Sequence, residues 1–191
     1  MKYKTLLLIT IIMQLGACSG LPTFSNLNKD YTFSEHDSIV IIGVNPRYRI
    51  GIQSGKYDGE YWERNELSVL SLNLFPEKGY VVAKLPPLKE TEAYALDQVL
   101  PDDIGGKRYP LCDKHSTLTF NTIKGKVLYI GDIKLLQKDN KLKISFDSNI
   151  EHARKFLLNE YPTLANKLVS AETKIIPTKE ECKPETIYII I

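Results

Sequence analysis

Short runs of β-branched and aromatic residues, separated by turn residues, recur along most of this chain of 191 residues. Ser38–Val44 is a run of valine and isoleucine typical of a buried strand, and Tyr48–Ile52 alternates apolar with polar residues after a turn at Pro46. We expect these two strands to form a hairpin. Strands at 67–74 and 80–85 are predicted to form a second hairpin, and strands at 117–122, 127–136 and 142–146 a meander. This order of short strands predicts an antiparallel β-sandwich.

The strongest helical pattern comes late in the chain. Ser148 and Glu151 have the spacing of a capping box, and apolar residues follow at helical spacing. The pattern predicts a helix over about 148–161, which Pro162 ends or continues as a second short turn. Two further segments are a stretch at 93–100 that fits a strand or a short helix, and an apolar end at 187–191 that we expect to be a last strand. The sequence therefore predicts a mainly β fold with one C-terminal α-helix, in a single domain over 37–191.

The first residues have the pattern of an export signal. Lys2 and Lys4 precede nine uncharged residues, Thr5–Met13, which have the length of a secretory hydrophobic region and are too few to span a bilayer. The sequence Leu15-Gly16-Ala17-Cys18 follows almost directly. This arrangement resembles the lipobox of bacterial lipoproteins. A plain signal peptide with a chance cysteine, or a buried cytosolic helix, are the alternatives.

The lipoprotein resemblance implies where the protein is held. It implies that residues 1–17 are removed, that the Cys18 thiol carries diacylglycerol and that the new amino group is acylated, as with palmitate. Several acyl chains anchor a protein almost permanently, since each buried CH₂ contributes about 0.8 kcal/mol. Ser19 stands where inner-membrane lipoproteins carry aspartate, which implies the periplasmic face of the outer membrane. Residues 18–36 are polar and without a period, so we expect a flexible tether.

Two cysteines remain once Cys18 is assigned to lipid. Cys112 and Cys182 form an even pair in an oxidising compartment, and we expect them to form a disulfide. Closing a loop of about seventy residues stabilises a fold by roughly 4 kcal/mol in the chain-entropy account. The alternative is a metal or redox pair. Cys112 and His115 have the spacing of two zinc ligands, but no second ligand pair accompanies them.

The distribution of charge argues against a nucleic-acid partner. The formal charge is +2, from 25 basic and 23 acidic residues, and Lys2 and Lys4 of the expected signal account for that excess. Basic and acidic residues are interleaved along the rest of the chain, without the basic stripe that nucleic-acid binding requires. No glycine-rich loop leads from a strand into a helix, so no nucleotide cofactor is expected.

Two short segments resemble known sandwich domains. Gly79–Pro87, with Tyr94 after it, looks like the strand and corner of prealbumin-like, carboxypeptidase-regulatory-like domains, except that Leu88 stands in place of the corner's glycine. Gly125–Asp132 is similar to a strand of envelope lipoproteins that carry such domains, and the helix after Asp147 fits the same proteins. The resemblance implies an Ig-like or prealbumin-like sandwich. It implies no catalytic residue.

Residues that could support catalysis or bind metal are few and scattered. His36 lies between two acids where the expected tether ends, His115 lies in a loop, and His152 comes early in the expected helix. A nucleophilic site would need one of them beside a nucleophile. Asp102-Asp103 could act as an acid–base pair or a calcium anchor, but the spaced carboxylates of a calcium loop are missing. We therefore expect neither an enzyme nor a metal site.

A group of aromatic residues gives the one candidate binding surface. Tyr57, Tyr61 and Trp62 lie beside acidic residues in a loop between two strands. Such rings can contact a sugar or anchor a partner protein, whereas the alternative is that Trp62 plugs one end of the sandwich. We expect a binding module of the cell envelope, with an envelope protein or a glycan as its partner. An envelope enzyme acting on glycan or peptide and a purely structural envelope component are the competing hypotheses.

Overall fold

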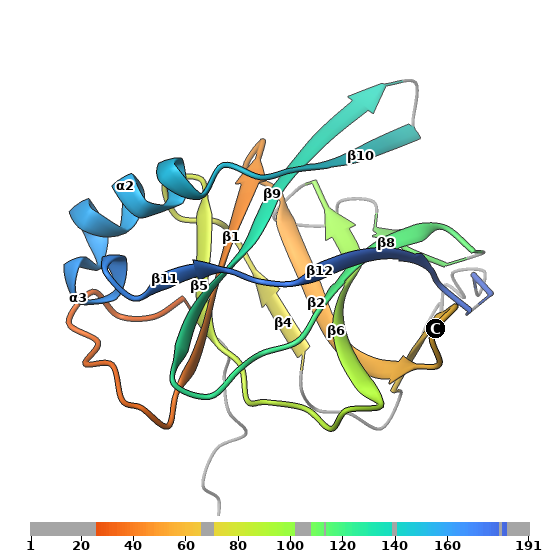
Figure 1. Cartoon of the computed structure of the whole chain (residues 1–191). Coiled ribbons are helices and arrows are strands. Elements are labelled where there is room, and N and C mark those ends of the chain that lie inside the picture. The colour runs from red at the N-terminus through yellow and green to blue at the C-terminus, as the bar shows by residue number, and fades with distance from the viewer. Residues whose placement is uncertain are drawn as a thin grey trace, which may run out of the picture.

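The computed structural model describes residues 26–65, 71–101, 108–112, 114–138, 141–179 and 181–182. Within these ranges, two β-sheets pack against each other and helix α2 covers the outer side of one of them (Figure 1). This arrangement confirms the predicted mainly β, sandwich-like fold with a short C-terminal helix. No helix in the described part of the chain is long and apolar enough to cross a membrane.

The first sheet, sheet A, has the strand order β10-β9-β1-β5, with β11 placed beside β9. Strands β1 and β11 both run parallel to β9, whereas β5 and β10 run antiparallel to their neighbours. Sheet A is therefore mixed, so the antiparallel pairing that the sequence predicts holds for only part of this sheet. Parallel neighbours need long crossover connections. Between β1 and β9 the chain passes through the other sheet, and between β9 and β11 it passes through the helices. Its strands are β1 (Ser38–Asn45), β5 (Tyr80–Lys84), β9 (Lys126–Lys138), β10 (Lys141–Asp147) and β11 (Leu168–Ser170).

The second sheet, sheet B, is antiparallel and has the order β12-β8-β6-β2-β3. Strand β4 also pairs with β2, and β7 pairs with β6. The segment at 93–100, for which the sequence pattern fits strand or helix, is the central strand β6. The strands are β2 (Arg49–Tyr57), β3 (Trp62–Arg64), β4 (Ser71–Leu74), β6 (Glu92–Leu100), β7 (Tyr109–Pro110), β8 (Ser116–Phe120) and β12 (Thr173–Pro177).

The chain changes sheet at turns where the sequence predicts hairpins. After the cis Asn45–Pro46 peptide, β2 enters sheet B instead of pairing with β1. Likewise β4 pairs with β2 while β5 pairs with β1, so the second predicted hairpin is also wrong. Of the predicted meander, β9 and β10 form a hairpin, but β8 belongs to sheet B. Both inner faces of a sandwich are apolar, so alternation along a strand does not say which sheet the strand joins.

Strand β1 is buried on both faces. Val40, Ile42 and Val44 point into the core between the sheets, and Ile39 and Ile41 point toward the helices. Ile39 to Ile42 are fully buried. A strand with two buried faces has a continuous apolar sequence rather than an alternating one, which accounts for the run that the sequence shows here.

Helix α2 (Ile150–Glu160) begins one residue later than the predicted capping box. Asn149 is its N-cap, and the Asn149 Oδ1 accepts a hydrogen bond of 3.2 Å from the His152 amide. The Tyr129 hydroxyl of β9 accepts a bond of 2.9 Å from the Asn149 amide. The predicted pairing of Ser148 with Glu151 is therefore wrong, because the cap position is set by contact with β9. A short helix, α3 (Pro162–Ala165), follows as the sequence allows.

The segment Gly125–Asp132 connects strand β1 of sheet A to the start of helix α2. The Gly125 amide donates to the Asp37 carbonyl at 2.7 Å, and Tyr129 holds the start of α2. Gly131 has a φ of +129°, and a Cβ there would lie 3.0 Å from the Asp147 carbonyl. The register between β9 and β1 shifts at the same place. A positive φ and a close backbone approach both favour glycine, so this segment serves the fold.

Tyr94 closes the corner that follows β5. Its hydroxyl donates a hydrogen bond of 2.8 Å to the Pro86 carbonyl, and the Thr122 hydroxyl donates to the same oxygen at 2.9 Å. The Tyr94 ring stacks on Phe120 inside the core between the sheets, with centroids 5.7 Å apart. This side chain therefore ties sheet B to the corner leaving sheet A.

Part of the expected tether is packed on the domain. The Leu27 amide donates to the Val82 carbonyl at 2.9 Å, and the Leu27 carbonyl accepts from the Tyr161 hydroxyl at 2.7 Å. Tyr31 and Phe33 contact the core between sheet A and the helices. Residues 26–36 are thus an ordered part of the domain, and the expectation of a tether is wrong for them. The apolar residues of this segment have no periodic spacing because the segment is neither a helix nor a strand, yet each contacts the core.

A buried carboxylate holds this N-terminal segment in place. Asp37 is 4% exposed and accepts hydrogen bonds from the Tyr31 hydroxyl, the Ser34 amide at 2.8 Å and the Lys84 ammonium. Burial alone raises the pKa of Asp37, but the bonds from Lys84, Tyr31 and Ser34 outweigh it and place the pKa below its ordinary value. The ionised form is therefore the one that the fold stabilises.

Acid should weaken the domain through this group. A carboxyl whose pKa is lower in the folded state stabilises above its unfolded pKa, near 3.9, and loses that contribution as the pH falls through the folded pKa. Asp37→Asn should remove this part of the pH dependence, so the loss of stability below about pH 4 becomes shallower. Urea midpoints measured at pH 7 and at several lower values test this. Equal slopes for both proteins would contradict it.

The two predicted partner cysteines are together. Cys112 and Cys182 form a disulfide pair with Cα atoms 5.2 Å apart, within the usual range for disulfides, and lie 70 residues apart in the sequence. The pair fastens the chain beyond β12 to the segment just before β8. The last predicted strand, 187–191, lies outside the described residues, as do the lipobox and Asp102-Asp103.

Candidate functional site

The three aromatic residues of the candidate surface have separate roles. Trp62 is fully buried, its indole N–H donates to the Ala93 carbonyl at 3.0 Å, and it packs on Ala95 and Ile176, on the face of sheet B opposite the core between the sheets. Trp62 is therefore a core residue whose ring is not accessible to a ligand. Tyr61 is half-buried, and its amide binds the Asp58 carboxylate in the turn before β3. Tyr57, at the end of β2, reaches a pocket described below.

Gly55 makes room for Trp62. A Cβ at Gly55 would lie 2.3 Å from the Glu63 carbonyl and 2.5 Å from the indole. Gly55→Ala should push β3 and Trp62 outward, with a loss of about 1–3 kcal/mol in unfolding free energy, as overpacking usually costs. Urea unfolding followed by the fluorescence of this single tryptophan measures the loss. Lys56→Ala, at an exposed position of the same strand, is the control; Gly59→Ala is unsuitable because Gly59 has a positive φ. Equal losses of stability in Gly55→Ala and Lys56→Ala would contradict this account.

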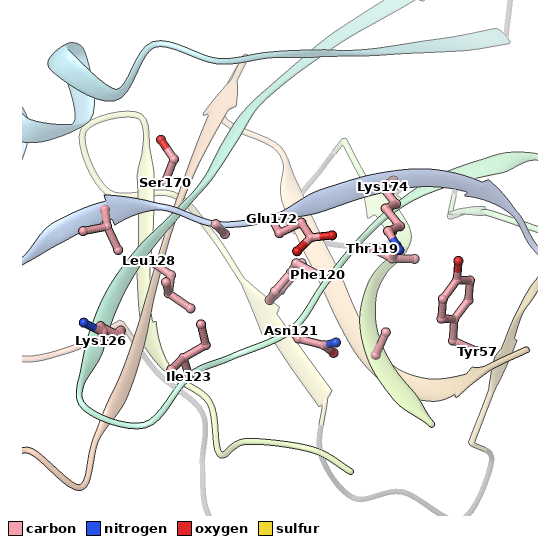
Figure 2. Close-up of a pocket in the computed structure, with 13 residues that line it drawn as sticks. Tyr57, Thr119, Phe120, Asn121, Ile123, Lys126, Leu128, Ser170, Glu172 and Lys174 are labelled. Carbon is pink, nitrogen blue, oxygen red and sulfur yellow. The ribbon is translucent and has the colours of Figure 1, made fainter. Parts of the chain in front are cut away.

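A pocket of about 230 Å³ opens where the two sheets separate at one edge (Figure 2). Strand β11 of sheet A and strand β12 of sheet B are joined by Ala171 and Glu172, so this stretch crosses from one sheet to the other. Below it, the chain from β8 to β9 diverges from the crossing. We call this opening the seam pocket. It is lined by Tyr57, Ala93, Thr119, Phe120, Asn121, Ile123, Lys126, Leu128, Val169, Ser170, Ala171, Glu172 and Lys174.

The floor of the seam pocket is apolar and belongs to the sandwich core. Phe120 and Leu128 are 3% and 1% exposed and pack between the sheets. Ile123 and Val169 stand at the rim and are 55% and 43% exposed. Scattered exposed apolar residues are ordinary, but two of them beside an opening into the core mark a place where a ligand can gain buried apolar area.

The rim of the seam pocket carries polar groups of both kinds. Glu172 and Asn121 lie near its centre in Figure 2, with Lys126 toward one end and Lys174 beside Tyr57 at the other. The Lys174 ammonium lies 5.5 Å from the centroid of the Tyr57 ring, a cation–π contact. The ion pairs found among the described residues do not include Lys126, Glu172 or Lys174. Among the described residues, the Lys174 ammonium thus contacts the Tyr57 ring, and Lys126 and Glu172 have no ion-pair partner.

The buried ion pair of Asp97 and Arg64 is part of the fold. Asp97 is 6% exposed beside Arg64; burial raises its pKa, and Arg64 acts in the opposite direction without cancelling that effect. The two residues lie on strands β6 and β3 of sheet B, and their ion pair links these strands. We therefore assign the pair a structural role.

The three histidines do not meet at one site. His36 is exposed beside the Asp37 network, the His115 carbonyl accepts a bond of 3.0 Å from the Thr178 amide, and His152 lies in the first turn of α2. His152 lines a hollow of about 410 Å³ together with Asp132 and Lys134. The Lys134 ammonium in this hollow is already bound to the Asp147 carboxylate, at 2.7 Å. No group of three or more metal-ligating side chains is found in the described ranges.

The seam pocket could not be found by reading the sequence. Its lining comes from four segments, at 57, 93, 119–128 and 169–174. The two strands that frame it, β11 and β12, have only three and five residues, too few for a clear alternating pattern. Only Tyr57 of the aromatic group was a signal for it. No family model, curated protein or solved structure matches this chain.

Proposed function

We propose that the protein is a lipid-anchored protein of the cell envelope whose domain binds a saccharide of the envelope in the seam pocket. The observation that carries the proposal is the combination of an apolar floor, Phe120 and Leu128, with a rim of amide, carboxylate and ammonium groups. A sugar ring presents an apolar C–H face and hydroxyls that both donate and accept hydrogen bonds. Asn121 and Glu172 can accept from such hydroxyls, and Lys126 and Lys174 can donate to them.

The charge of the rim suits a neutral or weakly acidic ligand. Lys126 and Lys174 face a single acid, Glu172, so the described lining has an excess of one positive charge. A strongly anionic polymer would call for a wider basic surface. A glycan that carries occasional carboxylates fits this balance.

The composition of the seam pocket supports binding over hydrolysis. Glycosidases position two carboxyl groups on either side of the scissile bond, and the lining contains one, Glu172. Its lining includes the hydroxyls of Ser170 and Thr119 but no histidine that could activate them as a general base. The competing proposal of an envelope enzyme therefore lacks its catalytic groups at this place.

The proposed anchor would keep the start of the domain close to the membrane. If Cys18 carries the lipid, only seven residues, or eight Cα–Cα steps, lie between it and Asn26, whose side chain accepts a hydrogen bond of 3.1 Å from the Val82 amide. A fully extended chain covers at most about 3.6 Å per residue, so the domain would lie within about 29 Å of the bilayer. The reach from Cys18 to Asn26 is shorter than the reach of a tether that extends over residues 18–36.

Photocrosslinking in intact cells tests the proposal. A benzophenone amino acid replaces Ile123 at the pocket rim or, as a control, Leu158 on the outer side of α2; the two side chains are 55% and 54% exposed. We expect an adduct at Ile123 that a muramidase shortens, and none at Leu158. A discrete protein-sized adduct at Ile123, or equal adducts at both positions, would contradict the saccharide proposal.

A further inference from the structure

Two arginines share one aromatic ring at the end of the domain where strand β2 begins. The guanidinium carbons of Arg47 and Arg49 lie 4.9 and 4.4 Å from the centroid of the Phe75 ring, so both side chains make cation–π contacts with it. We call these three residues the arginine cluster. It holds two positive charges on one small patch of the surface.

The described part of the chain provides no acid to balance the arginine cluster. The ion pairs found among the described residues include neither Arg47 nor Arg49, and the Arg49 Nε is buried without a hydrogen-bond partner. Two like charges beside one ring repel each other, and an anion bound to both would offset that repulsion. Arginine suits a phosphate because its planar fork can donate two parallel hydrogen bonds to phosphate oxygens.

Space for the rest of a ligand lies beside Arg47. This side chain lines the hollow of about 410 Å³ that also includes Asp132, Lys134 and His152. Lys134 is bound to Asp147, and Asp132 is the one acid of the lining. Asp132 would repel an anion but can accept hydrogen bonds from hydroxyls. The lining therefore suits a ligand with its phosphate on the arginines and a hydroxylated group, such as glycerol, in the hollow.

The arginine cluster lies where the N-terminal segment meets the domain. The Asn26 side chain donates a hydrogen bond of 2.9 Å to the Phe75 carbonyl. The proposed lipid on Cys18 is eight Cα–Cα steps before Asn26, a reach of at most about 29 Å. The proposed anchor would thus hold this part of the domain near the phosphates of the bilayer.

We propose that the arginine cluster binds the phosphate of an anionic phospholipid and so orients the domain on the membrane. This inference rests on the proposed lipid anchor, which supplies the membrane. Strand β2 begins at Arg49 and ends at Tyr57, which lines the seam pocket. Eight steps of about 3.3 Å place these two ends about 26 Å apart. A lipid bound at one end of β2 would leave the seam pocket at the other end free to meet a glycan.

The acylated full-length protein in vesicles tests the proposal. Vesicles of phosphatidylcholine alone are compared with vesicles that also contain phosphatidylglycerol, and the fluorescence of Trp62 reports thermal unfolding. A ligand that binds only the folded protein stabilises it, so we expect phosphatidylglycerol to raise the thermal midpoint by about 2 °C or more. The double variant Arg47→Glu with Arg49→Glu should show no rise.

The chain offers a matched control for the loss of charge. Lys89 and Lys124 are exposed, and the ion pairs among the described residues include neither. The double variant Lys89→Glu with Lys124→Glu changes the net charge by the same amount and should keep the full rise. No rise for the wild type, or an equal rise for both double variants, would overturn the proposal.

Two further arms separate the possible reasons for a result. Inorganic phosphate, added to phosphatidylcholine vesicles at the phosphate concentration of the anionic lipid, should not raise the midpoint; an equal rise would overturn the proposal in favour of a soluble anion. The intact mass of the protein reports the acyl chains on Cys18 separately. A protein without them would refute the anchor alone, and its co-sedimentation with the two kinds of vesicle would then test the arginine cluster. These measurements do not involve the saccharide ligand of the seam pocket.

Discussion

Replacement of Cys18 by alanine is expected to leave the protein as an unprocessed precursor without lipid. The prediction follows from Leu15-Gly16-Ala17-Cys18 after the uncharged run Thr5–Met13, because the thiol is the group that receives diacylglycerol in the lipoproteins that this segment resembles. Electrophoresis and intact-mass measurement of membrane fractions give the readout. The precursor should be larger by residues 1–17, and the mature wild-type protein should carry added acyl mass.

Ser19→Ala is the matched control for the Cys18 variant. It changes the neighbouring residue and keeps the thiol, so processing and acylation should continue. Globomycin, which blocks the peptidase that cleaves before the lipidated cysteine, should reproduce the precursor in wild-type cells. Two observations together would contradict the lipoprotein proposal. The Cys18→Ala protein would be cut to the mature size, and neither this variant nor the wild type would carry acyl chains.

Removal of the Cys112–Cys182 pair is expected to lower the unfolding free energy by up to about 4 kcal/mol, the chain-entropy value for a loop of this length. The loop spans 70 residues and contains β8, β9, β10, both helices, β11 and β12, so its closure limits much of the unfolded chain. The double variant Cys112→Ser with Cys182→Ser should therefore unfold at a lower urea concentration than the wild type.

Reduction gives an independent control for the disulfide. Wild-type protein treated with dithiothreitol should unfold at the same urea concentration as the double variant, and that variant should not respond to the reductant. Alkylation under native conditions should label neither Cys112 nor Cys182 before reduction. Equal midpoints for the oxidised wild type and the double variant would contradict a stabilising bond.

Local pattern predicted several of the strands, among them β1, β2 and β9, but it left β6 undecided, missed β11 and β12, and did not show how the strands pair. The run Ser38–Val44 and the alternating stretch at 48–52 are both strands, yet they belong to different sheets. Pairing is decided by which partner covers each apolar face, and those partners lie far away in the sequence. β1 illustrates this, because its neighbours are β5 and β9.

The helix cap and the tether show a second limit of the sequence. Ser148 and Asn149 both suit an N-cap, and the contact of Tyr129 with the Asn149 amide decides between them. Leu27, Tyr31 and Phe33 look like scattered residues of a linker, but each contacts the core between sheet A and the helices. In both cases a tertiary contact overrides a local preference.

The candidate site was the part least accessible from the sequence. The aromatic group pointed to one side of it through Tyr57, whereas Trp62 proved to be a core residue. Asn121, Glu172 and Lys174 are ordinary surface residues until the crossing from β11 to β12 brings them around Phe120. A site built from single residues of separate segments has no spacing that a sequence pattern could reveal.

The claim that the seam pocket holds the ligand is tested most directly by filling that pocket. Asn121 is exposed at the pocket rim, so Asn121→Trp can occupy the opening without entering the core. In cells that carry the benzophenone at Ile123, this substitution should reduce the muramidase-sensitive adduct by about tenfold or more, which corresponds to about 1.4 kcal/mol of binding free energy, while the thermal midpoint stays unchanged. An undiminished adduct with the pocket filled would contradict the account.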